Sequence, residues 1–292
     1  MKTPPYISLK AQPKPFRGKK YLALAAALLV PAASVLAQTL WNGGTGANTW
    51  NSTANWTGGV IPNGTVNCTD DKGSNNIILI QSGDPAFQHG DTLAGNAANT
   101  SGAWLQTGST NFTGGGNWFR MAVGTGSYGS YVLSNGVVNV GGQTHIGEYG
   151  VGYLEIDGGV FNTAADPFCL GDGDFGPNPV GYMVMNGGTN NISSEFWIGE
   201  GNATKRGIGY FTMNGGTINV NFWWDIGRWG ADGYFTMNGG TINKTGGGDC
   251  QWGAYNNGVP SSATVNMTGG TININNNLEI GEAGNGTVGG TC

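Results

Sequence analysis

Charged residues are scarce in this 292-residue chain. They make up 10% of the sequence, against roughly a quarter in a typical soluble domain. Only 12 residues are basic, and six of them lie before residue 38, which leaves six basic against 17 acidic residues after it. Residues 38–292 therefore carry a net charge of −11, which excludes a protein that binds nucleic acid by neutralising its phosphates.

Long apolar runs are also scarce. The one run of this kind, at residues 21–37, follows a basic segment that has no acidic residue, and it ends in small residues. This order is typical of a secretory signal peptide, so we expect residues 1–37 to be removed on export to the extracellular space or outer cell surface. No later run approaches the roughly 18 apolar residues of a transmembrane helix, so we expect none in the mature chain.

Cysteine and histidine are too few to suggest a cofactor or a catalytic motif. The four cysteines form neither a disulfide scaffold nor a Cys-x-x-Cys metal site. The two histidines, His89 and His145, are far apart, and alternation places His145 on an outward strand position where we expect it to be solvated. No GxSxG, HExxH or P-loop motif occurs. We therefore expect no enzyme; if the protein is one, a polysaccharide lyase or hydrolase is the expected class, with its site near the insertions at 166–179 or 245–260.

Glycine is present in excess, at 56 residues, without the period of three that collagen requires. The ten Trp, ten Tyr and 11 Phe exclude a disordered chain. Residues 209–220 (GYFTMNGGTINV) and 233–244 (GYFTMNGGTINK) are nearly identical, and weaker copies begin near residues 129, 152, 181 and 262. An apolar residue followed by a glycine precedes each copy, as in Ile146-Gly147 and, we expect, Val123-Gly124. The chain is therefore built from repeats.

Each repeat of about 23–30 residues contains three short segments of alternating polarity, separated by Gly and Asn turns. This pattern predicts an all-β, single-stranded parallel β-helix, right-handed by the general preference for right-handed crossovers. A propeller blade needs about 40–50 residues and is disfavoured. We expect a signal peptide (1–37), an N-terminal region rich in Trp and turns (38–116), and β-helix coils (117–292) that are truncated at the C-terminus. Cys169 and Cys250 would lie three coils apart, too far for a disulfide.

Stacked coils place equivalent residues in ladders. We expect a structural ladder of asparagines, in which side-chain amides bond along the axis, at Asn139, Asn162, Asn191, Asn219, Asn243 and Asn273. Asn190 and Lys244 break the apolar pattern and are interpreted as local distortions of the strands. A flat array of Thr189, Thr217, Thr241 and Thr271 lies beside the ladder. We expect it to be ordinary solvated β surface, and the alternative is a plane that contacts ice or glycans.

Aromatic residues form a second set of candidates. Tyr153, Tyr182, Tyr210 and Tyr234 occupy one position of four successive coils. They either shield a corner of the core or bind sugars, and Trp197 and Trp223, on outward positions, would extend such a ligand-binding surface.

Acidic residues follow the apolar-Gly pair in several coils. Glu148, Asp172 and Glu200 would stack closely in successive coils, and Asp174 adds a further carboxylate. Like charges at this spacing either splay into water or hold a cation, so a Ca²⁺ site is an alternative to the expected absence of any cofactor.

The N-terminal WNGGTGANTW (41–50) and NW-x-GG (55–59), followed by strings such as IGEYGVGYLEIDGG (146–159), resemble the autotransporter-associated and PEP-CTERM-associated β-strand repeat proteins. The resemblance implies an exported bacterial surface protein of the Gram-negative type with a passenger-like β-helix, and it supplies no catalytic residues. We therefore expect a structural protein or adhesin at the cell surface, whose partners are surface glycans or cell-envelope components. The alternatives are carbohydrate binding or processing and, more remotely, ice binding.

Overall fold

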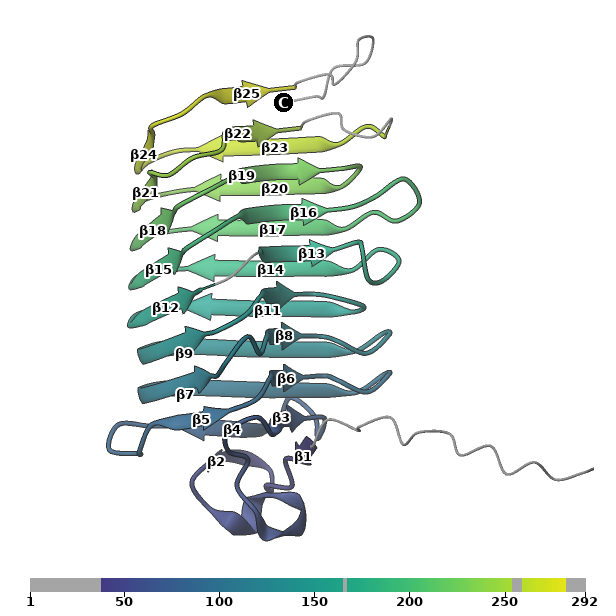
Figure 1. The fold of residues 1–292 in the computed structure, drawn as a ribbon, viewed down its shortest axis with the longest axis vertical. Helices are drawn as coiled ribbons and strands as arrows, with labels where there is room; N and C mark the ends of the chain where they lie inside the picture. Colours follow the sequence, from purple (N-terminus) through teal and green to yellow (C-terminus); the bar gives the residue numbers. More distant parts are fainter. Residues whose placement is uncertain (1–37, 165–166, 254–258, 282–292) are drawn as a thin grey trace, which may run out of the picture. The chain divides into compact units, whose positions relative to one another are not determined.

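The computed structural model describes residues 38–164, 167–253 and 259–281; the expected signal peptide and Cys292 lie outside this range. The described chain is an all-β solenoid of about nine turns, and all pairings between its strands are parallel (Figure 1). The predicted fold class is therefore confirmed. Only two short 3₁₀ turns, η1 (Thr53–Asn55) and η2 (Thr57–Gly59), interrupt it. No helix in the described residues is long and apolar enough to cross a membrane.

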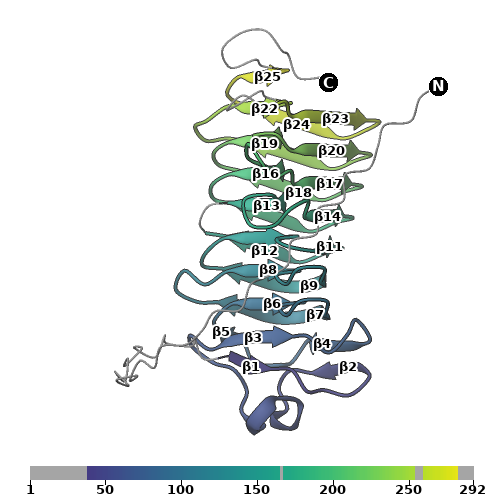
Figure 2. The same ribbon diagram turned by 90° about the vertical axis from the view of Figure 1, so that its right-hand side faces the viewer.

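Equivalent strands of successive coils pair into three columns, which Figure 2 shows from the side. The first column is a ten-stranded sheet of β1 (Gln38–Leu40), β3 (Asn67–Asp70), β6 (Thr92–Ala94), β8 (Phe119–Met121), β10 (Thr144–Ile146), β13 (Phe168–Asp172), β16 (Phe196–Glu200), β19 (Trp224–Arg228), β22 (Cys250–Trp252) and β25 (Leu278–Ile280). The second column contains β2 (Gly46–Thr49), β4 (Asn76–Ile80), β7 (Ser101–Thr113), β9 (Tyr128–Val140), β11 (Val151–Ile156), β14 (Val180–Met185), β17 (Ile208–Met213), β20 (Asp232–Met237) and β23 (Ser262–Met267). The third contains β5 (Phe87–His89), the second halves of β7 and β9, β12 (Val160–Thr163), β15 (Thr189–Ile192), β18 (Thr217–Val220), β21 (Thr241–Lys244) and β24 (Thr271–Ile274).

Three strands per coil are present from β10 onward, as the repeats predict. In β7 and β9 the second and third segments continue as one 13-residue strand, which joins two columns into a 15-stranded sheet. Both sheets contain strands from before and after residue 116, the expected boundary between the N-terminal region and the coils. The region 38–116 therefore already contributes strands to the solenoid.

One predicted repeat marker is wrong. Met121 pairs with Ile146, so Ala122, and not Gly124, is the equivalent of Gly147. Ala122 accordingly has the left-handed φ of 61° that glycine takes at this corner, where Gly147 has a φ of 81°. The apolar-Gly pair at 123–124 lies two residues further along and does not mark the corner.

Alternate strand residues face a single apolar core. In β17, for example, Phe211 and Met213 are buried and Thr212 between them is not. Edge-to-face contacts, with ring centroids 5.1–5.8 Å apart, connect one coil to the next; they involve Phe119, Phe161, Phe168 and Phe196. Burial of the apolar core, these rings included, holds the coils together, since no coil can bury its own apolar face.

Three tryptophans of the N-terminal region cover the end of this core. Trp41 and Trp56 meet edge to face at 4.8 Å, and Trp50 stacks on Phe87 at 3.9 Å. All three are buried. The residues that the sequence marks as rich in Trp and turns therefore act as an aromatic cap for the solenoid.

Asn190 and Lys244 are not local distortions, because the strand register is unbroken through both. Each is fully buried in the core. Lys244 satisfies its ammonium group by donating to the carbonyl oxygens of residues 246, 247 and 248 at 2.8–3.0 Å, and burial lowers its pKa. Neither side-chain atom of Asn190 has a hydrogen-bond partner.

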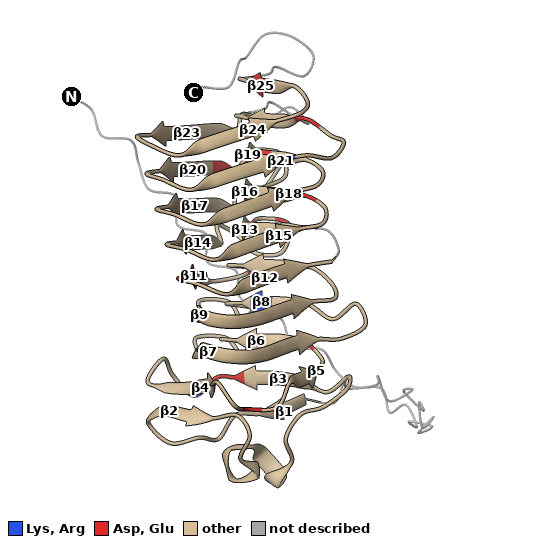
Figure 3. Ribbon diagram, turned by 90° about the vertical axis from the view of Figure 1, so that its left-hand side faces the viewer, with Lys and Arg blue, Asp and Glu red and all other residues tan. Residues whose placement is uncertain are grey.

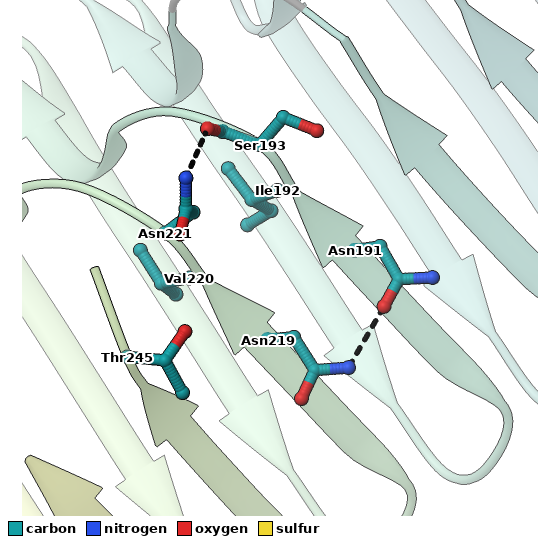
Figure 4. Close-up of a pocket in the computed structure, with 7 residues that line it drawn as sticks. All are labelled: Asn191, Ile192, Ser193, Asn219, Val220, Asn221 and Thr245. Atoms are coloured by element: carbon teal, nitrogen blue, oxygen red, sulfur yellow. Dashed lines mark hydrogen bonds between the residues drawn. The ribbon is translucent and has the colours of Figure 1, made fainter.

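The predicted asparagine ladder is present along the third column. Each side-chain amide donates to the Oδ1 of the equivalent Asn in the preceding coil at 2.8–3.0 Å, from Asn273 down to Asn139. Figure 4 shows one rung, between Asn219 and Asn191. A second ladder was not predicted: Asn238 donates to Asn214, and Asn214 to Asn186. These bonds fix the register of neighbouring coils along the axis.

Candidate functional site

A cavity of about 350 Å³ lies on the outer side of the ten-stranded sheet, beside β10, β13 and β16. It is lined by Trp118, Gln143, His145, Pro167, Asp172, Asp174, Phe175, Trp197, Glu200 and Trp229. The insertion that follows β13 supplies Asp174 and Phe175. This is one of the two insertions in which the sequence suggested looking for a site.

Strand register explains which side chains meet here. His145, Cys169 and Trp197 occupy the same outward position of three successive strands. Asp172 and Glu200 are paired at the ends of β13 and β16, as the sequence predicts. A parallel stack thus gathers residues that are 24–28 positions apart in the chain.

His145 is not solvated as expected, but 1% exposed. Its ring stacks on Trp118, with centroids 5.1 Å apart, and meets Phe175 edge on at 5.4 Å. Strand alternation correctly predicts that the His145 side chain lies on the side of the sheet away from the core. It does not predict that Phe175 and Trp118 cover that side.

The two ring nitrogens of His145 have different environments. Nε2 is 2.9 Å from Oε1 of Gln143, an acceptor, and therefore carries the proton. Nδ1 is 2.7 Å from Oδ2 of Asp172, but the two atoms are not aligned as a hydrogen bond and Nδ1 has no other partner. Nδ1 thus lies buried in an ion-pair contact with the Asp172 carboxylate.

Cys169, Asp172 and Glu200 form a compact group behind this histidine. One ligand atom of each, the thiol sulfur or a carboxylate oxygen, lies within 4.8 Å of the others, and all three residues are buried. Burial, reinforced by the charge of Asp172, raises the pKa of Glu200 to about 9. Burial also raises the pKa of the Cys169 thiol well above its ordinary value.

The other two acidic candidates do not join this group. Glu148 forms a buried ion pair with Arg120, whose Nε donates to Oε2 at 2.8 Å. Asp174 is exposed and accepts a hydrogen bond from Asn202 at 2.9 Å. Figure 3 shows how thinly acidic and basic residues are spread over the remaining coils.

Arg228 contacts two of the tryptophans that line the cavity. Its guanidinium carbon is 4.0 Å from the ring centroids of both Trp197 and Trp229. Its Nη1 donates to Oε2 of Glu195 at 2.7 Å. Trp223, the other tryptophan candidate, lies outside the cavity and contacts Phe222 at 6.2 Å.

The tyrosine candidates align in register as predicted. Tyr182, Tyr210 and Tyr234 stack face to face, with centroids 4.7–4.8 Å apart and planes 10° from parallel. Both faces of Tyr210 are therefore covered by tyrosines, so a sugar ring cannot stack on it. Tyr153 donates from its hydroxyl to Glu155 at 2.7 Å. The threonine array is also in register, from Thr189 to Thr271.

The sequence did not predict Trp118, Gln143, Phe175 and Trp229 of the cavity, or Cys169 in the group behind it. A signal for some of them was present, because the outward column of the first sheet contains Arg120, His145, Cys169, Trp197 and Asp225, unusual residues for a solvated β surface. Trp118, Phe175 and Trp229 lie outside the strands, where no periodicity applies.

Comparisons with family models, with curated proteins and with solved structures each found no match for this chain.

Proposed function

We propose that this protein is an exported β-solenoid adhesin that binds carbohydrate, and that the aromatic cavity beside β10, β13 and β16 is its binding site. The observation that carries the proposal is the lining of the cavity. Three tryptophans and Phe175 surround a few convergent polar groups, which include Gln143 and Asp174.

A sugar ring matches such a lining because it presents both apolar C–H faces and hydroxyl groups. Aromatic walls bury the faces, and a small number of placed polar groups give orientation and specificity. Asp174 is exposed at the cavity and Gln143 lies deeper, beside His145. Hydroxyl groups can donate to the carboxylate and exchange hydrogen bonds with the amide.

The setting supports adhesion. The basic and apolar order of residues 1–37 is that of a signal peptide, and the repeat strings resemble those of bacterial surface proteins. The stacked coils form a scaffold on which one cavity is held by strands of three different coils.

The test is a glycan array with the secreted chain, followed by calorimetry on the best ligand. We expect Trp197→Ala and Trp229→Ala to weaken binding at least about tenfold, equivalent to about 1.4 kcal/mol. Tyr210→Ala and Trp223→Ala are matched controls outside the cavity, and they should bind like wild type.

Loss of binding in Tyr210→Ala with retention in both cavity variants would place the site on the tyrosine ladder instead. Binding to no glycan would contradict the proposal. Turnover of a bound polysaccharide that Asp172→Asn abolishes would identify an enzyme and contradict the non-catalytic role.

A further inference from the structure

The group behind the cavity has the composition of a transition-metal site. Cys169, Asp172 and Glu200 each bring a ligand atom to within 4.8 Å of the others. His145 is not one of the three residues within that distance of one another, but its Nδ1 lies 2.7 Å from Oδ2 of Asp172, which places it to add a nitrogen. The four residues come from three successive strands, β10, β13 and β16, or from their ends.

His145 gives the independent indication of a ligand. The residue is 1% exposed, and its Nδ1 lies 2.7 Å from Oδ2 of Asp172 with no hydrogen bond between the two atoms. A buried nitrogen and a carboxylate oxygen this close, without a hydrogen bond between them, are stabilised when both bind one cation. Its Nε2, meanwhile, is held by Gln143, which is the arrangement that fixes the tautomer and orientation of a metal-binding histidine.

Glu200 supports the same conclusion. Its residue exposure is 1%, its carboxylate lines the cavity, and none of its side-chain oxygens makes a hydrogen bond to a described residue. A cation between Asp172 and Glu200 would be coordinated by two buried carboxyl groups, each with an oxygen within 4.8 Å of the other.

We propose that His145, Cys169, Asp172 and Glu200 bind one divalent transition-metal ion of the zinc type. One nitrogen, one sulfur and two oxygens suit the tetrahedral preference of Zn²⁺. Ca²⁺, the cation suggested by the sequence, takes six to eight oxygen ligands, and here Glu148 is bound to Arg120 and Asp174 faces solvent. The ion would link three coils and fix the floor of the cavity, independently of any sugar.

The experiment measures metal binding to the intact secreted chain, stripped with chelator and titrated with Zn²⁺, Co²⁺ or Ca²⁺. We expect one Zn²⁺ per chain, a higher melting temperature with Zn²⁺ than with Ca²⁺, and a sulfur-to-cobalt charge-transfer band with Co²⁺. Cys169→Ser and Glu200→Gln should each weaken Zn²⁺ binding at least about 100-fold, and Gln143→Ala about tenfold. The matched controls are Cys250→Ser and Cys68→Ser, which change buried thiols of other coils and should bind Zn²⁺ like wild type.

The sulfur-to-cobalt band is measured on wild-type protein, so it tests thiolate ligation even if a ligand variant fails to fold. Wild-type protein that binds no Zn²⁺, or a Co²⁺ complex without the thiolate band, would overturn the proposal. Equal Zn²⁺ affinity in Cys169→Ser and wild type would do the same. Because the readout is metal content, a failure here leaves carbohydrate binding to be judged on its own test.

Discussion

Single residues that depart from the repeat pattern reveal where the fold tolerates an unfavourable free energy of burial. Asn190 lies in the inward column between Phe161 and Ile218 and has two unpaired buried polar atoms. Asn191, next to it, faces outward and belongs to the complete asparagine ladder. Alternation explains both, since adjacent residues of a strand point to opposite sides of the sheet.

We expect Asn190→Leu to stabilise the protein by about 1–3 kcal/mol, because it removes two unsatisfied buried groups and adds apolar contact. The same substitution at Asn191 should destabilise it, because it breaks two rungs of the ladder. Urea unfolding midpoints of the two variants and wild type check this pair. A lower midpoint for Asn190→Leu would show that the buried amide has a partner that stabilises it.

Corner glycines differ in how strongly the fold requires them. Gly147 has a φ of 81°, and a Cβ there would lie 2.1 Å from the carbonyl oxygen of Val180 in the next coil. A Cβ at Gly44 would meet no atom within 4 Å. We expect Gly147→Ala to cost at least about 2 kcal/mol and Gly44→Ala less than about 0.5 kcal/mol. Thermal melting of both variants checks this, and similar melting temperatures would contradict the assigned coil contacts.

At the scale of elements, Asp70 joins β3 to β7. Its carboxylate accepts backbone N–H groups of Lys72 at 3.0 Å and Ala103 at 2.8 Å, and it is fully buried. Its pKa is raised from the ordinary 3.8 to about 7; burial is the largest cause and the charge of Asp71 adds to it, while the two N–H groups and the charge of Lys72 act in the opposite direction. The folded state therefore holds this proton more tightly than the unfolded state.

The contribution of Asp70 to stability is complete below about pH 4 and is lost as the pH rises through 7. We expect the stability of wild type, measured by urea unfolding relative to Asp70→Asn, to fall between pH 4.5 and 7.5. Asp84→Asn, in a surface turn, serves as the control and should follow wild type. Parallel pH profiles for wild type and Asp70→Asn would contradict the raised pKa.

The strands and their register follow from the sequence because the repeats are self-similar and alternate with period two. The Asn, Tyr and Thr columns all pair as the repeat alignment predicts. The alignment fails at Ala122, which occupies the left-handed corner that other coils fill with glycine. Gly124, two residues further along, was aligned with those corner glycines by mistake. It also fails in β7 and β9, where two segments form one continuous strand.

At the scale of the whole described solenoid, the candidate site depends on residues that lie outside the repeated strands. Register predicts that Asp172 and Glu200 meet, and the insertion after β13 was a predicted place to search. Periodicity cannot predict that Phe175 and Trp118 cover His145, because these residues lie outside the strands and their positions depend on tertiary contacts. The tyrosine ladder differs from the cavity, because the sequence predicts its register correctly. Its tyrosines stack on one another, however, and this covers the ring faces that a sugar would need.

The central claim is that the aromatic cavity binds carbohydrate, and the most direct test is an NMR titration that follows the tryptophan indole N–H signals. The account predicts that, as ligand is added, the signals of Trp197 and Trp229 shift and saturate with the affinity measured by calorimetry, whereas those of the buried cap residues Trp41 and Trp56 stay in place. Saturation of binding with no change at Trp197 and Trp229 would contradict it.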